Sequence, residues 1–145
     1  MVLKQKPYCN FKKFDILRSY MNSFKQWFRI INNQKPVGFL KILDDNTQLF
    51  SKDNYAWNTQ TIAYEKAFHW SGIIDRNNYP LFENDIIALR LTSQPNPKKQ
   101  YMIIFDEAMQ QFFLNDLNSD ERLTLFAGKL PIINKQEITF IGVSI

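Results

Sequence analysis

The stretch Ser71–Ile87, SGIIDRNNYPLFENDII, decides the fold that the sequence predicts. It starts with the end of an apolar strand, which runs into Gly72 and then into a polar turn from Asp75 to Asn78. The apolar pair Leu81-Phe82 follows, and a second tight turn at Glu83-Asn84-Asp85 leads into a strand of aliphatic residues. Asn and Asp are common in such turns because they tolerate left-handed backbone. The stretch therefore predicts a small, tightly turned β unit.

Short apolar segments separated by polar turns continue on both sides of this stretch. We expect strands at Phe24–Ile31, Val37–Leu43, Thr47–Phe50, Phe68–Ile73, Ile86–Leu91, Tyr101–Phe105, Gln111–Leu114 and Ile138–Ile145, and a short apolar element at Leu123–Leu130. The polar segments Ser51–Gln60 and Thr92–Lys99 predict loops, with Tyr55 and Trp57 as apolar anchors of the first. Many short strands with close turns predict a mainly β (α+β) fold, either a small bent sheet or an SH3-like barrel.

The segment before residue 23 predicts a basic amphipathic helix. Within Asn10–Asn22, apolar residues recur at spacings of three and four and so share one helix face; they are Phe11, Phe14, Leu17 and Met21. Asn10 is a suitable N-cap. We therefore expect a helical segment over residues 1–22 and a β domain over residues 23–145. Such a helix could pack on its own domain, lie on a membrane or enter a partner's groove, and packing on its own domain is the commonest outcome.

The composition fits a single globular domain, with 145 residues of which 45% are hydrophobic. Aromatic residues make up 15% of the chain, and this high share favours strands and large buried contacts. Cys9 is the only cysteine, so packing rather than an intramolecular disulfide must stabilise the fold. No apolar run approaches the roughly 18 residues of a membrane span, and no signal-peptide core follows the first lysines. We expect a soluble, cytoplasmic protein that contacts no membrane.

Positive charge is concentrated in the first third of the chain. Residues 1–43 carry nine Lys or Arg and one acid, Asp15, whereas residues 44–145 carry nine basic and thirteen acidic residues. A basic third of this kind suits an acidic protein, nucleic acid or an anionic surface as a partner. A solvated helix face followed by a tail explains the same charges without any ligand.

Residues for catalysis or metal binding are few. A zinc site needs clustered His, Cys or carboxylate ligands, but the chain has one His and one Cys, far apart in sequence. Asp75, Glu83 and Asp85 form the best carboxylate cluster, and turn acids that cap backbone N–H groups explain it better than a bound cation does. His69 stands between two aromatic residues in a predicted strand and is expected to be structural. With no phosphate-binding glycine motif either, we expect no enzyme, no metal and no cofactor.

Nucleic-acid binding finds support in the segment around Trp27. On a strand, Lys25, Trp27 and Arg29 share one face, and the other face carries Phe24, Gln26, Phe28 and Ile30. Small β-barrels bind nucleic-acid strands through aromatic stacking beside basic side chains. The predicted helix would extend this basic surface with Lys12, Lys13 and Arg18. The competing interpretation is a half-buried Trp27 with the aliphatic stems of Lys and Arg packed along it.

The stretch Ser71–Ile87 also resembles the YopX family, small proteins of phages and prophages in low-GC bacteria, whose pattern is close to TGLKDKNGKEIYEGDIV. The matching positions are Ser71, Gly72, Ile73, Asp75, Arg76, Asn77, Leu81, Phe82, Glu83, Asp85, Ile86 and Ile87. Weaker similarities in Phe24–Trp27, Tyr101–Leu114 and Ile141-Gly142 extend the resemblance over residues 24–145. Asn78 and Asn84 replace two family glycines, and Phe28 replaces an acid. Asn tolerates positive φ better than most residues, so both turns are expected to persist.

The resemblance implies a phage origin and a fold, and no enzymatic activity defines the family. It predicts a phage-encoded accessory protein that acts inside the host bacterial cell by stoichiometric binding to a host or phage protein. Inhibition of a host defence system is one such role. Aromatic residues beyond the needs of one core favour a protein interface or a homo-oligomer. The alternative function is nucleic-acid binding through the basic first third.

Overall fold

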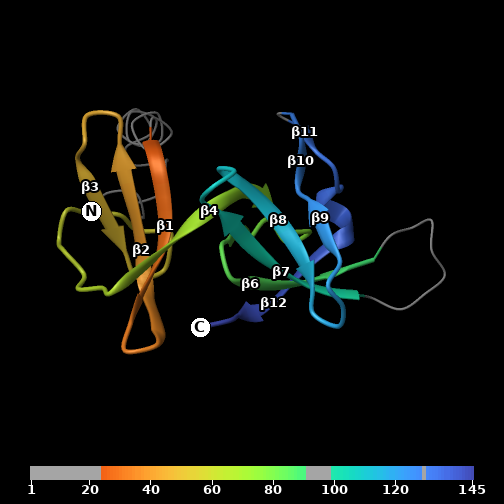
Figure 1. Ribbon diagram of the computed structural model, residues 1–145. Helices are drawn as coiled ribbons and strands as arrows, with labels where there is room; N and C mark the ends of the chain where they lie inside the picture. The colour runs from red at the N-terminus through yellow and green to blue at the C-terminus, as the bar shows by residue number, and fades with distance from the viewer. Residues whose placement is uncertain (1–23, 91–98, 129) are drawn as a thin grey trace. The chain divides into compact units, whose positions relative to one another are not determined.

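The computed structural model describes residues 24–90, 99–128 and 130–145 (Figure 1). The predicted helix at Asn10–Asn22, with Lys12, Lys13 and Arg18, lies outside these residues, as does most of the predicted loop Thr92–Lys99. The chain divides into two compact units, residues 1–68 (unit 1) and residues 69–145 (unit 2). A single β domain over residues 23–145 stays a prediction.

The described residues form β-strands and one short 3-10 helix, with no α-helix among them, so the predicted mainly β fold is confirmed. Unit 1 contains β1 (Phe24–Asn32), β2 (Lys35–Leu43), β3 (Gln48–Ser51) and the start of β4 (Lys66–Ile74). Unit 2 contains the rest of β4 and then β5 (Pro80–Phe82), β6 (Asp85–Leu89), β7 (Lys99–Asp106), β8 (Gln111–Asp116), β9 (Arg122–Thr124), β10 (Phe126–Ala127), β11 (Leu130–Pro131), the 3-10 helix η2 (Lys135–Glu137) and β12 (Ile138–Val143). Each predicted strand has its counterpart, with ends that differ by two residues at most.

Unit 1 is an antiparallel meander in which β2 lies between β1 and β3. The turn from β1 to β2 has two residues, Asn33 and Gln34, and both have positive φ (51° and 62°). Such a turn matches the right-handed twist of the strands that it joins. The pairing then shifts by one residue between Ile30 and Ile31, and this shift places Trp27 opposite Lys41.

Both faces of this meander carry apolar clusters. The buried residues of one face are Phe28, Ile30, Leu40 and Phe50. The buried residues of the other cluster are Leu43, Leu49 and Trp57, against which Phe24, Trp27 and Phe39 pack. Trp57 therefore anchors the loop after β3, as predicted. Tyr55, the other predicted anchor, is 57% exposed. The side chain of Asp53 stabilises the turn there, because its Oδ1 accepts hydrogen bonds from the backbone N–H groups of Tyr55 and Ala56.

Unit 2 is built on an open antiparallel sheet in the order β12-β6-β7-β8-β9. The edge strands β12 and β9 do not pair with each other in the described part of the chain. The predicted SH3-like barrel is therefore wrong, because a barrel closes only when its first and last strands pair. Strand β9 has three residues, and the chain leaves it at once for the β10–β11 pair. The other predicted form, a sheet, agrees with the structure.

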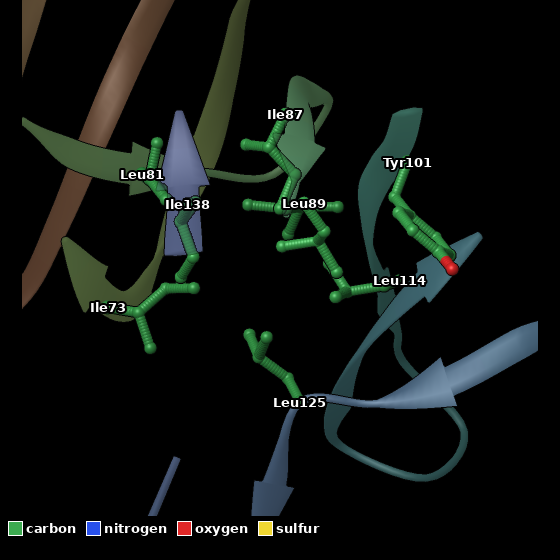
Figure 2. Packing of buried hydrophobic residues seen from close by; sticks show 9 residues of the cluster. Ile73, Leu81, Ile87, Leu89, Tyr101, Leu114, Leu125 and Ile138 are labelled. Atoms are coloured by element: carbon green, nitrogen blue, oxygen red, sulfur yellow. The ribbon is translucent and has the colours of Figure 1, made fainter. Parts of the chain in front are cut away.

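The hydrophobic core of unit 2 packs on one face of this sheet (Figure 2). Its buried residues are Ile73, Leu81, Ile87, Leu89, Tyr101, Ile103, Leu114, Leu125 and Ile138. Neighbouring strands present these residues in register, as where Ile87 of β6 stands opposite Tyr101 of β7. Burying one such aliphatic side chain stabilises a fold by about 1.5–3 kcal/mol. The stretch that decides the fold thus supplies core residues as well as turns.

Candidate functional site

A buried carboxylate organises the first turn of the Ser71–Ile87 stretch. Asp75 has no exposed surface. Its Oδ1 accepts hydrogen bonds from the backbone N–H groups of Asn77 (2.8 Å) and Tyr79 (2.9 Å), and its Oδ2 accepts one from the N–H of Phe140 (3.1 Å). Asp75 thereby fastens the turn to the edge strand β12. Its role is structural, because all three contacts are backbone donors of the fold.

A second buried carboxylate holds the other turn. Asp85 also has no exposed surface, and its Oδ2 accepts the backbone N–H of Phe82 at 2.8 Å. The N–H of Asn84 donates to the carbonyl of Ile103 (2.7 Å), and the N–H of Ser144 donates to the carbonyl of Asn84 (2.8 Å). This turn therefore joins β7 to the residue that follows β12. Asp75 and Asp85 accept backbone N–H groups, as the sequence predicted for turn acids.

Three residues of the stretch have positive φ, and for two of them, Asn78 and Asn84, the turn chemistry predicted it. Asn78 and Asn84 have φ of 66° and 68°, so the prediction of left-handed backbone at both asparagines is confirmed. Gly72 has φ of 89°, and a Cβ at this position would stand 3.2 Å from Cζ of Phe126. Gly72 therefore makes room for the ring of Phe126, which begins strand β10.

His69 lies beside Glu83, the third acid of the predicted cluster. Nδ1 of His69 is 3.5 Å from Oε1 of Glu83, and the imidazole ring stacks on Phe105 with 5.0 Å between the centroids. The backbone N–H of Glu83 also donates to the carbonyl of His69 (2.8 Å). Within the described ranges, no group of three or more His, Cys, Asp or Glu residues could hold a metal ion. The three acids Asp75, Glu83 and Asp85 thus serve three separate contacts of the turns.

The predicted basic strip of β1 is only partly at the surface. Lys25 is exposed, whereas Trp27 is half-buried and donates through Nε1 to Oδ1 of Asn54 (3.2 Å). Arg29 is 8% exposed, and its guanidinium lies 5.7 Å from the ring centroid of Phe39. The half-buried position of Trp27 agrees with the competing interpretation, in which Trp27 is a packing residue. It leaves Lys25 as the one strip residue of β1 that solvent reaches freely.

The predicted division of β1 into two faces needs one correction. Phe24 lies with Trp27 rather than with Phe28, and the rings of Phe24 and Trp27 meet edge to face with 5.6 Å between their centroids. The cause is a shift in the pairing of β1 with β2 between Phe24 and Gln26. Such a β-bulge adds a residue to one strand and turns the following side chains to the opposite face. Lys25 and Gln26 are both exposed as a result.

Lys41, which sequence reasoning did not single out, is a nearly buried lysine surrounded by aromatic rings. The side chain is 8% exposed, and Nζ lies 4.5 Å from the ring centroid of Trp27 and 4.8 Å from those of Phe24 and Trp57. Burial lowers the pKa of Lys41 to about 8. Aromatic faces attract an ammonium group, which offsets part of the free energy lost on leaving water. A lone lysine within a strand ordinarily indicates a solvent-facing position. The aromatic surroundings of Lys41 become visible only from the pairing of β1 with β2, which places Trp27 opposite Lys41.

Unit 2 carries a short strand pair beyond β9, formed by β10 and β11, which we call the arm (described residues 126–128 and 130–131; Figure 1). In the arm, Phe126 pairs with Pro131 and Ala127 pairs with Leu130. The residue before the arm, Leu125, is 1% exposed and belongs to the core of unit 2. The sequence predicted a short apolar element here, and nothing in it indicated that the element reverses its direction.

The outer part of the arm and the residue after it are apolar and exposed. Leu130 is 73% exposed and Ile132 is 56% exposed, although the N–H of Ile132 is bound to the carbonyl of Leu125 at 3.0 Å. Ala127 and Pro131 are exposed as well. The arm therefore has a fixed base, and its described residues include exposed apolar side chains.

Two surface cavities accompany these features. An open groove of about 520 Å³ in unit 1 lies between β3 and the loop of residues 52–62. A smaller cavity of about 230 Å³ lies at the base of the arm, and it is lined by Gln110, Gln111, Phe112, Thr124, Phe126 and Gly128. We call it the arm cavity.

In the part of the chain that the structure describes, no helix is both long and apolar enough to cross a membrane. Comparisons of the chain with protein-family models, with curated proteins and with solved structures found no match. The resemblance of Ser71–Ile87 to the YopX family therefore stays a prediction.

Proposed function

We propose that this protein acts by stoichiometric binding of a protein partner and that the arm of unit 2 is the contact. The observation that carries the proposal is the exposure of Leu130 on the arm and of Ile132 immediately after it, next to a base that is anchored. Isolated exposed apolar residues are ordinary on protein surfaces, whereas apolar residues gathered on one projection are typical of interaction sites.

The anchoring of the arm favours a binding role. Leu125 is buried in the core immediately before the arm, and the ring of Phe126 packs where Gly72 leaves space. A contact surface held in place before binding loses less conformational freedom when the partner arrives. The arm therefore suits a preformed contact.

The biological setting of the proposal comes from the resemblance of Ser71–Ile87. It is that of a phage-encoded accessory protein, and the partner is a host or phage protein, with inhibition of a host defence system as the role. Unit 2 also exposes Tyr79, Leu117, Ile141 and Ile145, by 44% or more each, and these residues are further apolar groups at its surface.

The test compares proteins captured from host cells by the tagged full chain and by two variants. L130D/I132D places one charge on the arm and one on the residue after it, and it is expected to lose at least one stoichiometric partner that the unaltered chain retains. M109D is the matched control, because Met109 is 56% exposed in a different turn of unit 2. Equal thermal midpoints establish that both variants fold. Capture of the same proteins in equal amounts by L130D/I132D and the unaltered chain contradicts the proposal.

A second candidate function, nucleic-acid binding, is favoured by the exposed Lys25 beside the half-buried Trp27. A titration with short single- and double-stranded DNA and RNA separates it from the first. Micromolar affinity that falls steeply with salt would support it, because Lys and Arg contacts to phosphates release counterions. Unchanged affinity after neutralising Lys12, Lys13, Lys25 and Arg29 together would exclude it.

A further inference from the structure

We propose that Lys41 in unit 1 is a covalent binding site for a small uncharged aldehyde, which condenses with Nζ to form an imine. The observation that carries this inference is an amine enclosed by three aromatic rings, those of Phe24, Trp27 and Trp57. We call the amine and these rings the Lys41 site. The inference is independent of the proposed function, because the arm belongs to unit 2.

Strand pairing places the amine among the rings. Trp27 of β1 stands opposite Lys41 of β2, and Leu49 of β3 stands opposite Lys41 on its other side. Residues that oppose each other on antiparallel strands project their side chains from the same face of the sheet. On this face Leu49 packs with Leu43 and Trp57 in an apolar cluster. The amine of the middle strand therefore points into apolar surroundings, and the residue is only 8% exposed.

The charged groups of the neighbouring elements have contacts of their own. Lys25 of β1 is exposed, and the guanidinium of Arg29 lies 5.7 Å from the ring centroid of Phe39. Strand β3 has no ionisable side chain. In the loop after β3, Oδ1 of Asp53 accepts a hydrogen bond from Oγ of Ser51 at 3.0 Å. Burial among the rings is therefore the main influence on the protonation of the enclosed amine.

This burial activates the amine as a nucleophile near neutral pH. Condensation with an aldehyde needs the neutral amine, and a lysine with the ordinary pKa of about 10.4 holds only about 0.4% of it at pH 8. Burial lowers the pKa of Lys41 to about 8, so about half of its amine is neutral at that pH. Desolvation in an apolar pocket is one of the ways in which proteins activate lysine.

The rings favour one reaction of the amine over others. Nζ attacks the carbonyl carbon and forms a C–N bond, which becomes a double bond when the carbonyl oxygen leaves as water with the two amine hydrogens. The imine then takes up a proton to form an iminium cation, which aromatic faces attract as they attract the ammonium group. Reaction with carbon dioxide would instead leave a carbamate anion against the rings, and acylation would leave a neutral amide. The Lys41 site therefore suits an aldehyde.

The enclosure of the amine limits the size and charge of that aldehyde. Phe24 and Trp27 are half-buried, so these two rings separate Nζ from solvent. A ligand reaches Nζ when the rings move aside, and a compound of a few carbon atoms needs the smallest movement. A charged aldehyde would lose its hydration among the rings. The geometry therefore points to a small uncharged aldehyde.

The experiment measures the reaction rate of each lysine in the folded full chain. Propionaldehyde is added with cyanoborohydride, which reduces the imine to a stable secondary amine, and mass spectrometry of the digested protein counts the product at each position. At pH 8, Lys41 is expected to react at least tenfold faster than Lys25, an exposed lysine of β1. The rate at Lys41 is expected to rise from pH 6 and to level off near pH 8. Glyoxylate, an anionic aldehyde, is expected to show no preference for Lys41.

A variant tests whether the rings cause this reactivity. W27L removes one ring and admits water to Nζ, so the rate at Lys41 is expected to fall at least threefold at pH 8 and to level off at a higher pH. Y55L is the matched control, because Tyr55 is an exposed aromatic residue of unit 1. Equal thermal midpoints establish that both variants fold. If W27L fails to fold, F24L removes another ring of the Lys41 site and takes its place.

The outcomes decide the inference without reference to the arm. Faster reaction at Lys41 than at Lys25, with a rate that levels off near pH 8, supports it. Equal or slower reaction at Lys41 overturns it. Reaction of Lys41 only after the chain is unfolded in urea overturns it as well, because the amine is then a packing group alone. Partner capture by L130D/I132D tests the proposed function separately.

Discussion

At the scale of single residues, the carboxylate of Asp75 accepts backbone hydrogen bonds that a neighbouring strand would otherwise accept. Its two oxygens accept three backbone N–H groups, two from its own turn and one from β12. An edge strand without such a partner would leave an N–H group exposed for pairing with another chain. The carboxylate therefore satisfies the turn and covers part of the edge of the sheet.

We predict that D75N lowers the free energy of unfolding of the full chain by about 2–3 kcal/mol. The amide has one acceptor oxygen, so either the turn or Phe140 loses its acceptor, and a buried N–H is left facing an NH₂ group. Chemical denaturation measures the change. D45N is the control, because Asp45 accepts the N–H of Thr47 in an exposed turn, and its substitution should change stability far less. Equal effects of the two substitutions would contradict this account of Asp75.

The turn residues were the best-predicted feature of the molecule. Asparagine at positions 78 and 84 indicated left-handed backbone because few other residues with a Cβ adopt it readily, and the observed φ values agree. The long-range bond from Asp75 to Phe140 could not be predicted. The local N–H donors of a turn carboxylate can be predicted because every such turn supplies them. A donor 65 positions away comes close only in the complete fold, so the turn sequence does not indicate it.

At the scale of elements, the placement of the arm depends on a single glycine. Gly72 combines a φ of 89° with a distance of 3.2 Å between its would-be Cβ and Cζ of Phe126. Both the backbone conformation and the packing therefore oppose any side chain at this position.

We predict that G72A lowers the free energy of unfolding of unit 2 by about 1–3 kcal/mol and weakens partner capture through the arm. Denaturation followed by circular dichroism measures the first effect, and the capture assay measures the second. G142A is the matched control, because a Cβ at Gly142 would meet no atom within 4 Å. If G72A is as stable as the unaltered chain, the ring of Phe126 moves aside without a loss of stability, and this account of Gly72 is contradicted.

Pairing register explains most of what sequence reasoning missed at this scale. A one-residue slip moves a side chain to the other face of a sheet. The shift between Ile30 and Ile31 sets Lys41 opposite Trp27, and the shift after Phe24 sets Phe24 beside Trp27. Strand positions follow from apolar periodicity, so they were predicted to within two residues. A bulge has no such periodic signal, so neither the surroundings of Lys41 nor the corrected face of Phe24 could be predicted.

At the scale of the whole molecule, two buried titratable groups shape the dependence of stability on pH. Burial lowers the pKa of Lys41 from 10.5 to about 8. Between these two pH values the unfolded chain still holds a proton that the folded chain has released, so stability rises with pH. Burial also raises the pKa of Tyr101 above its ordinary value of 10.0. At higher pH the unfolded chain loses the tyrosine proton first, so stability falls again.

We therefore predict that the free energy of unfolding rises by about 1–2 kcal/mol between pH 8 and pH 10 and then declines. Denaturation at fixed ionic strength, followed by tryptophan fluorescence, measures the rise, since Trp27 and Trp57 lie against Lys41. K41M is expected to abolish the rise, and K25M, at an exposed lysine, is expected to keep it. If the free energy of unfolding of K41M still rises over this pH range, a group other than Lys41 causes the rise.

The hydrogen bond from Phe140 to Asp75 also sets the order in which unit 2 can be completed during synthesis. A ribosome adds about 5–20 residues per second, so the 65 positions between donor and acceptor take on the order of ten seconds to emerge. Until Phe140 emerges, the carboxylate of Asp75 lacks this partner, and the sheet that grows from β6 to β9 lacks its edge strand β12. Unit 2 should therefore mature late, and a translational pause before β12 would lengthen the time in which chaperones or proteases can reach it.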